Sequence, residues 1–167
     1  RYGRGVVVTV FDIDGVLADV RHRLHHLQSH PKDWHGFFAA AVLDPVLEEG
    51  RQALHEAQAA GSTIVYVTGR PRRWRRDTQD WLARHGLPDG PLHMRPNHDR
   101  RPARFYKADV IGGIAAQDDL VAVIDDDDRV VAHLQELGLP VLHATWMRDE
   151  PRQLELLEQA QETEGRT

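Results

Sequence analysis

The chain has 167 residues, of which 41% are hydrophobic and 28% are charged, and its formal net charge is −5. This length and composition are typical of one folded globular domain and exclude an intrinsically disordered chain. The chain has no cysteine, which excludes disulfides, thiolate metal sites and a cysteine nucleophile.

The hydrophobic pattern alternates between short β-branched runs and longer amphipathic segments. In chain order it predicts a strand at 5–11, a helix at 44–61, a strand at 62–68, a helix at 71–85, a short strand at 92–95, a helix at 107–116, a strand at 120–124, a helix at 127–137, a strand at 140–143 and a helix at 151–161. Strands that alternate with helices favour an α/β fold, with a parallel sheet covered on both faces. Asp44 and Pro45 suit the start of the first helix.

Polar residues follow three of the buried strands. Because ligands bind beyond the carboxyl ends of parallel strands, the residues at these strand ends mark the candidate site. They are Asp12 and Asp14 after the first strand, Thr68, Gly69 and Arg70 after the second, and Asp125 and Asp126 after the fourth, with Lys107 opening the helix between the third and fourth.

Carboxylates brought together at one edge repel one another unless a cation neutralises them. Mg²⁺ prefers such oxygen ligands, while Arg70 and Lys107 can donate to phosphate oxygens. The combination predicts a site for a phosphate bridged to Mg²⁺, in which a carboxylate attacks the phosphorus.

The run FDIDGVLAD, then VTGR, then an isolated lysine, then IDDDD, resembles the four ordered motifs of the haloacid dehalogenase (HAD) superfamily of phosphatases. The resemblance implies a HAD-like Rossmannoid three-layer αβα sandwich with a central parallel sheet. It further implies that residues 1–167 form a single phosphatase domain, with a small insert or minimal cap at about 16–43.

The resemblance also implies a role for each matching residue. Asp12 would attack the phosphorus and form an aspartyl-phosphate, and Asp14 would act as general acid and then general base. Thr68 and Lys107 would hold the phosphoryl oxygens. The Asp12 carboxylate, the Asp14 backbone carbonyl and Asp125 or Asp126 would bind Mg²⁺, with Asp125 favoured because it directly follows Ile124.

Neither the gap before Asp44 nor the stretch from Arg70 to Leu92 is long enough for a full cap domain. We therefore expect an open site that suits a large substrate, such as a nucleic-acid end or a protein. Some capless relatives cover the site by oligomerisation instead.

A closer resemblance is to the 3′-phosphatase domains of phage-type polynucleotide kinase–phosphatases. It rests on VTGR, the pattern Arg75-x-x-Thr78-x-x-Trp81, the Lys107-Ala108-Asp109 stretch, and IDDDD followed by a strand that leads to Trp146. By this resemblance Arg23 and Arg70 contact phosphate, and Gly69 belongs to the phosphate-binding motif with Thr68. The chain has no G-x-x-x-x-G-K-[ST] loop, so a kinase or other repair domain is expected on the full-length chain or on a separate chain.

Residues 70–107 contain eleven lysines and arginines against four aspartates and glutamates. Such a basic segment in an acidic chain suggests a face that meets an anion, here a sugar-phosphate backbone. The alternative is an ordinary solvated helix face, with Arg73 and Arg76 paired to Asp77 and Asp80.

Two other groups of residues have alternative interpretations. His22 and His26 have the i, i+4 spacing of a zinc pair, although partly exposed residues without a metal are favoured. Trp34, Phe37 and Phe38 suit core packing, and a base-stacking platform is the alternative.

These observations predict a Mg²⁺-dependent phosphomonoesterase that removes 3′-phosphate from DNA or RNA ends. The alternatives are a small-molecule phosphatase, such as a nucleotidase, and a non-catalytic HAD scaffold that binds phosphorylated partners. Intact Asp12 and Asp14 argue against the scaffold.

No apolar run approaches the roughly 20 residues of a membrane span, and the N-terminus lacks the pattern of a signal peptide. We therefore expect no membrane partner and a cytoplasmic location. The sequence begins at Arg1 rather than at methionine, so we expect a trimmed or processed chain or one domain of a longer protein.

Overall fold

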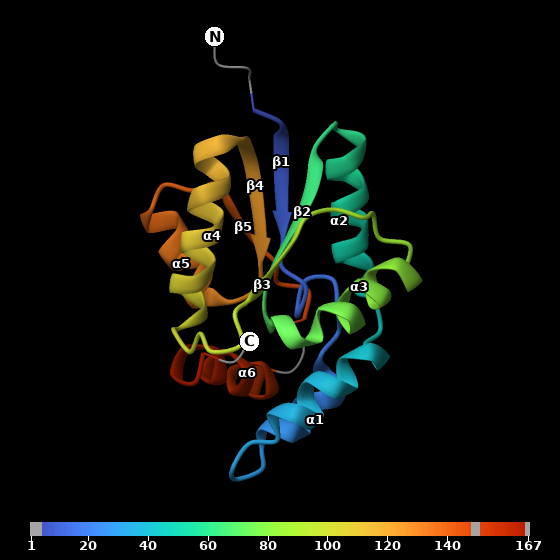
Figure 1. Ribbon diagram of the computed structural model, residues 1–167, viewed down its shortest axis with the longest axis vertical. Coiled ribbons are helices and arrows are strands. Elements are labelled where there is room, and N and C mark those ends of the chain that lie inside the picture. The colour runs from blue at the N-terminus through green and yellow to red at the C-terminus, as the bar shows by residue number, and fades with distance from the viewer. Residues whose placement is uncertain (1–4, 148–150, 166–167) are drawn as a thin grey trace.

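The computed structural model describes residues 5–147 and 151–165 and has a five-stranded parallel sheet at its centre (Figure 1). The strand order is β3-β2-β1-β4-β5. The strands are β1 (Val7–Phe11), β2 (Thr63–Pro71), β3 (Leu92–Arg95), β4 (Asp119–Asp125) and β5 (Val141–His143). Each expected strand is present, and all four neighbouring pairs run parallel.

Two pairs of helices cover the sheet, one pair on each face. Alternate residues of β1 face opposite sides of the sheet because side chains alternate along a strand. Val8 and Val10 pack with residues of α4 (Ala103–Gln117) and α5 (Asp128–Glu136), whereas Phe11 packs with residues of α2 (Glu48–Ala59) and α3 (Arg75–Arg84). This arrangement confirms the predicted three-layer αβα sandwich.

The helix expected from Asp44 instead begins at Glu48. Asp44 does not cap it, because the Asp44 carboxylate accepts hydrogen bonds from buried arginines, and Leu47 occupies the N-cap position with no side-chain cap. The helix expected at 107–116 starts earlier than predicted, at Ala103, so Lys107 lies in its second turn.

A third cluster of buried residues lies beyond the carboxyl ends of the strands. It joins η1 (Arg21–Leu27) and α1 (Trp34–Ala39) of the predicted small insert to α6 (Pro151–Thr163), through Leu24, Leu27, Phe37, Leu157 and Ala160. The short helices η2 (Ala40–Leu43) and η3 (Arg72–Trp74) complete the described elements.

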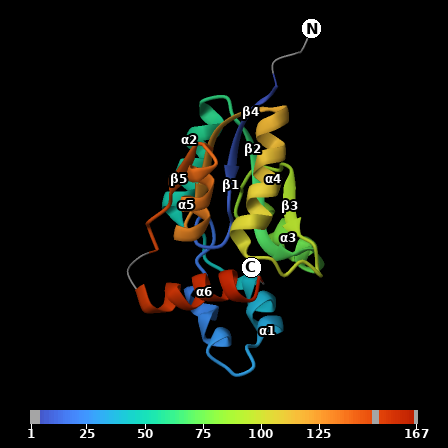
Figure 2. The ribbon, with the colours of Figure 1, turned by 90° about the vertical axis from the view of Figure 1, so that its left-hand side faces the viewer.

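The edge expected to be open is covered. Figure 1 and Figure 2 both show α6 lying across the carboxyl edge of the sheet beside α1. Glu164 pairs with Lys32 at 2.6 Å, and Glu162 pairs with Arg104 at 3.1 Å. The gap lengths did not predict this cover, because it comes from the C-terminal helix rather than from an inserted cap. Within the described parts of the chain, no helix is long and apolar enough to span a bilayer.

Candidate active site

The predicted site residues lie together at the carboxyl edge of the sheet. Asp12 and Asp14 follow β1, Asp125 ends β4, and Lys107 reaches this edge from α4. Seven of the predicted residues are at most 3% exposed: Asp12, Asp14, Arg23, Thr68, Arg70, Lys107 and Asp125.

The loop after β1 is shaped by a hydrogen bond and a glycine. Asp12 Oδ1 accepts the backbone N–H of Ile13 at 2.8 Å. Gly15 has a φ of 80°, and a Cβ at this position would overlap the Asp126 carboxylate. Glycine therefore lets the loop after β1 approach the loop after β4.

Three carboxylates form an acidic cluster, defined by Asp12, Asp125 and Asp126. Each offers an oxygen, and these atoms lie within 4.8 Å of one another. Lys107 Nζ lies 2.9 Å from Asp12 Oδ2 and 2.7 Å from Asp125 Oδ2. Burial alone would lower the pKa of Lys107, but Asp12 and Asp125 outweigh it and raise this pKa, so the ammonium is charged.

The acidic cluster has three carboxylates but one cationic side chain, Lys107. It therefore has the charge and the oxygen ligands to bind a cation. Asp126 Oδ1 is buried without a hydrogen-bond partner, and Asp12 Oδ2 meets Lys107 as an ion pair without hydrogen-bond geometry. Burial first, and then Asp125 and Asp14, raise the pKa of Asp12 to about 7 despite Lys107. Burial, Asp12 and Asp125 also raise the pKa of Asp126 well above its usual value. A bound cation would satisfy these oxygens and favour their ionised forms.

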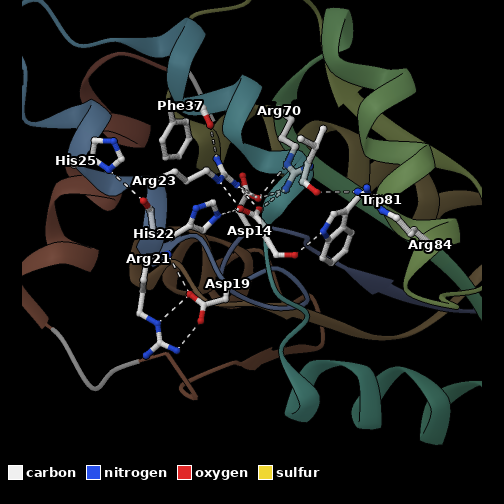
Figure 3. Close-up of polar contacts among 12 residues, drawn as sticks. Asp14, Asp19, Arg21, His22, Arg23, His25, Phe37, Arg70, Trp81 and Arg84 are labelled. Carbon is white, nitrogen blue, oxygen red and sulfur yellow. Dashed lines mark hydrogen bonds and ion pairs between the residues drawn. The ribbon is translucent and has the colours of Figure 1, made fainter.

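Beside the acidic cluster, two arginines and two aspartates form a buried network (Figure 3). Asp14 Oδ1 accepts hydrogen bonds from Arg23 Nη2 at 2.8 Å and from Arg70 Nη2 at 2.6 Å. Asp44 accepts from Arg23 Nε at 2.9 Å and from Arg70 Nη2 at 3.2 Å. Here, unlike in the acidic cluster, the two carboxylates are balanced by two guanidinium groups.

The arginine network controls the charge of Asp14. Burial alone would raise the pKa of Asp14, but Arg70 and Arg23 outweigh it and hold this pKa well below its usual range. The carboxylate of Asp14 is therefore ionised in this arrangement. Its side chain faces the arginines and is not one of the acidic cluster's ligand groups.

The phosphate-binding motif expected at Thr68 to Arg70 is held from two sides. Thr68 Oγ1 accepts the backbone N–H of Arg70 at 3.2 Å, and Arg70 Nη1 donates to Thr78 Oγ1 at 3.3 Å. Arg95, fully buried, donates from Nε to the carbonyl of Gly69 at 3.2 Å. That Thr68, Gly69, Arg23 and Arg70 bind phosphate stays a prediction.

Two residues of this edge, Asp44 and Arg95, have other roles in the structure than the ones predicted from the sequence. Asp44 was interpreted as a helix cap, yet its carboxylate also meets His22 Nε2 at 2.6 Å, and its carbonyl accepts from Trp81 Nε1 at 2.9 Å. No local pattern distinguishes this aspartate from an ordinary helix cap. Arg95 was predicted, within the basic segment, to lie where it could contact a nucleic-acid backbone, but it is fully buried and donates to the carbonyls of Gly69 and Arg101.

The zinc alternative is not supported by the histidine geometry. His22 meets Asp44, whereas His26 meets Asp33. In the part of the chain that the structure describes, Asp12, Asp125 and Asp126 form the one group of three or more metal-ligating side chains. Phe37 and Phe38 are buried in a core cluster, as the packing interpretation predicted.

Comparisons with known proteins agree with this geometry. Residues 7–146 match the family described as the polynucleotide kinase PNKP phosphatase domain. The chain also resembles a chain in the structure of a Pnkp1/Rnl/Hen1 complex, with a TM-score of 0.70, 22% identity, and coverage of 85% of this chain and 48% of that one. No curated protein matches the chain.

Two further structures share the fold. A class C acid phosphatase from Bacillus anthracis has a TM-score of 0.62 at 12% identity and is matched over 93% of this chain and 79% of its own. A haloacid dehalogenase-like hydrolase from Streptococcus pneumoniae has a TM-score of 0.58 at 15% identity, with 90% of each chain covered. At such identities the likeness shows a HAD-like fold. The chain spans about half the length of the chain it matches in the Pnkp1/Rnl/Hen1 complex.

Proposed function

Because the chain belongs to the polynucleotide kinase PNKP phosphatase domain family, we propose that it hydrolyses the phosphomonoester at the 3′ end of a DNA or RNA strand. One observation carries the proposal. The buried Asp12 carboxylate lies beside Lys107 within a cluster of carboxylates that is short of positive charge. This arrangement suits a nucleophile that attacks a phosphate bound between a lysine and a cation.

In the proposed first step, an Asp12 carboxylate oxygen attacks the phosphorus, and the bond between phosphorus and the 3′ oxygen breaks. Lys107 and the Thr68 hydroxyl hold the phosphoryl oxygens while charge redistributes. In the second step, water attacks the aspartyl-phosphate, which releases inorganic phosphate and returns the Asp12 carboxylate.

Asp14 supplies the proton to the departing 3′ oxygen and then accepts one from the attacking water. This role requires its ion pairs with Arg23 and Arg70 to loosen, because they favour the ionised carboxylate. A phosphate dianion competes for the same guanidinium groups. Substrate binding and protonation of Asp14 are therefore linked through the two arginines.

The cation of the proposal is Mg²⁺, which prefers carboxylate and carbonyl oxygens and keeps several waters. Asp12, Asp125, Asp126 and the backbone carbonyl of Asp14 would hold it. When bound, it neutralises the carboxylates and the phosphate charge.

The test measures phosphate release with Mg²⁺ from a 3′-phosphorylated oligonucleotide, a 5′-phosphorylated one, a 3′-mononucleotide and an aryl phosphate. We expect a strong preference for the first substrate. Asp12→Asn serves as the blank and should abolish turnover, with an unchanged circular dichroism spectrum. Near-native turnover by this variant would contradict the aspartyl-phosphate mechanism.

The second candidate is a phosphatase of small phosphomonoesters. The burial of the site residues beneath α6 favours it, because a closed edge admits small molecules more readily than strands. Equal or faster turnover of the mononucleotide would support this candidate. We also propose that the 3′-phosphatase works with a kinase or another repair activity, on the same chain or a separate one.

A further inference from the structure

A small aromatic pocket lies between α1 and the end of β2. Its volume is about 160 Å³, below the roughly 300–1,000 Å³ of pockets that enclose a whole drug-sized ligand. It therefore suits a single planar group. Its walls are Trp34, His35, Phe38, Pro71, Arg73 and Trp74.

The pocket has a buried aromatic floor and an accessible rim. The rings of Trp34 and Phe38 are stacked with centroids 5.9 Å apart, and both residues are buried. Trp74 is half-buried and His35 is exposed, and their ring centroids are 5.4 Å apart. The floor residues, Trp34 and Phe38, are part of the core. The rim residues, Trp74 and His35, keep ring surface that core packing does not cover.

The pocket connects to the arginine network of the site at two points, one a peptide bond and the other a peptide bond followed by a ring contact. Pro71, in one wall, directly follows Arg70, whose guanidinium contacts Asp14. Phe38, in the floor, directly follows Phe37, whose ring lies 4.2 Å from the guanidinium carbon of Arg23. The pocket walls are therefore chain neighbours of Arg70 and of the ring that packs on Arg23, the two arginines predicted to contact the phosphate.

The rim of the pocket is positively charged. Arg73 is exposed and donates its backbone N–H to Asn97 Oδ1 at 2.9 Å, while its guanidinium has no hydrogen-bond or ion-pair partner among residues 5–147 and 155–165, whose side chains the structure describes. Arg72 and Arg76 are also exposed. An aromatic pocket with cationic neighbours matches a base joined to phosphodiesters, since bases stack on aromatic rings and backbones pair with arginine.

We propose that this pocket binds one nucleobase of the substrate strand by stacking against Trp74, with Arg73 binding a neighbouring phosphodiester. The inference rests on the proposed 3′-phosphatase function and adds a subsite that a phosphomonoester without a base cannot fill. Because stacking tolerates any base, the pocket is expected to select a strand rather than a sequence.

The test compares Trp74→Leu, which removes the aromatic ring, with Trp74→Phe, which keeps one. Trp74→Leu should raise KM for the 3′-phosphorylated oligonucleotide roughly 5- to 100-fold. Trp74→Phe should stay close to wild type, and neither should change kcat/KM for an alkyl phosphate, which has no ring to stack. Phe105→Leu, an exposed aromatic residue on α4, is the matched control, and thermal unfolding of each variant checks the fold.

Substrates lacking bases near the 3′ end provide a second arm. Wild type should bind an abasic strand about as weakly as Trp74→Leu binds the intact strand. Trp74→Leu should bind the intact and abasic strands equally. DNA and RNA versions of each strand identify the preferred sugar. If wild type prefers the oligonucleotide and Trp74→Leu keeps the same preference, the pocket proposal is wrong and the proposed function stands.

Direct binding separates failure of the pocket from failure of catalysis. With Asp12→Asn as background, a 3′-phosphorylated strand should quench tryptophan fluorescence more than its abasic counterpart does. Equal quenching by both strands would overturn the stacking proposal. Absence of oligonucleotide turnover by wild type would overturn the proposed function.

Discussion

Asp44 pairs with Arg23 and Arg70, the two arginines that also hold Asp14. A change at this one carboxylate therefore affects both arginines of the network. The Asp44 side chain is fully buried. Removing one partner of a buried ionic network leaves charges without compensation in a medium that solvates them poorly. The cost is far larger than for a similar pair at the surface.

Asp44→Ala is therefore expected to lower the free energy of unfolding by about 3–5 kcal/mol, because Arg23 and Arg70 keep their charge while losing an anion. Denaturant unfolding measures this change. Asp19→Asn is the control, since it breaks a half-buried pair with Arg21 and should cost only about 1 kcal/mol. Equal effects for the two variants would mean that the fully buried network contributes no more than this half-buried ion pair.

The acidic cluster makes cation binding depend on pH. The pKa of Asp12 is raised to about 7, so below this pH the carboxyl carries a proton that a cation must displace. We expect Mg²⁺ affinity to rise between pH 5.5 and 8, with proton release on binding. Calorimetry in buffers of different ionisation enthalpy measures the released protons. Binding without proton release would contradict the raised pKa.

The same raised pKa predicts how stability changes with pH when no cation is bound. The folded protein keeps the Asp12 proton above the unfolded-chain pKa of about 4, so it binds more protons than the unfolded chain. This contribution to stability is fully present below pH 4 and is lost as the pH rises through about 7. Mg²⁺ should therefore raise Tm more at pH 8 than at pH 5.5, and equal shifts at both values would contradict this linkage.

At the scale of elements, α6 closes the carboxyl edge through apolar packing and two ion pairs. Leu157 and Ala160 are buried among residues of η1 and α1. The ion pairs from Glu162 and Glu164 are partly exposed and so contribute little. Apolar packing is therefore expected to dominate the attachment of α6.

Leu157→Ala should lower the free energy of unfolding by about 2–5 kcal/mol, the range for a large-to-small change in a core. Leu43→Ala, at a side chain that is 73% exposed, should change it by less than about 0.5 kcal/mol. Hydrogen exchange of α6 amides shows whether the loss is local. Unchanged protection of α6 in Leu157→Ala would mean that another contact holds the helix.

The elements and the site were predictable to different degrees. Strands and helices follow from local periodicity, and the order of motifs at strand ends placed Asp12, Lys107 and Asp125 correctly at one edge. The role of Asp44 was not predictable, because it depends on Arg23 and Arg70, which are 21 and 26 residues away in the sequence. The covering by α6 depends on contacts across more than 100 residues, which no local pattern records.

Charge is unevenly distributed over the whole molecule. The net charge is −5, yet residues 70–107 carry eleven of the 21 lysines and arginines. Several of these have partners within the fold: Arg70 and Arg95 are buried, and Arg75 donates to the Leu92 carbonyl at 3.0 Å. Arg73 and Arg76 are exposed, so they are the better candidates for contact with a strand.

We expect KM for the 3′-phosphorylated oligonucleotide to rise steeply with salt, while KM for an aryl phosphate changes little, because each phosphodiester contact releases counterions. For a single strand the slope of log affinity against log salt is about −0.7 per contact. Replacing Arg73 and Arg76 together by glutamine should therefore make the slope less steep by about 1.4 if both contact the backbone. Arg51→Gln, on α2 and outside the basic segment, is the matched control. An unchanged slope in the double variant would mean that Arg73 and Arg76 belong to an ordinary solvated helix face. Contacts with the pocket and with the 3′-phosphate would then be the ones that hold a strand.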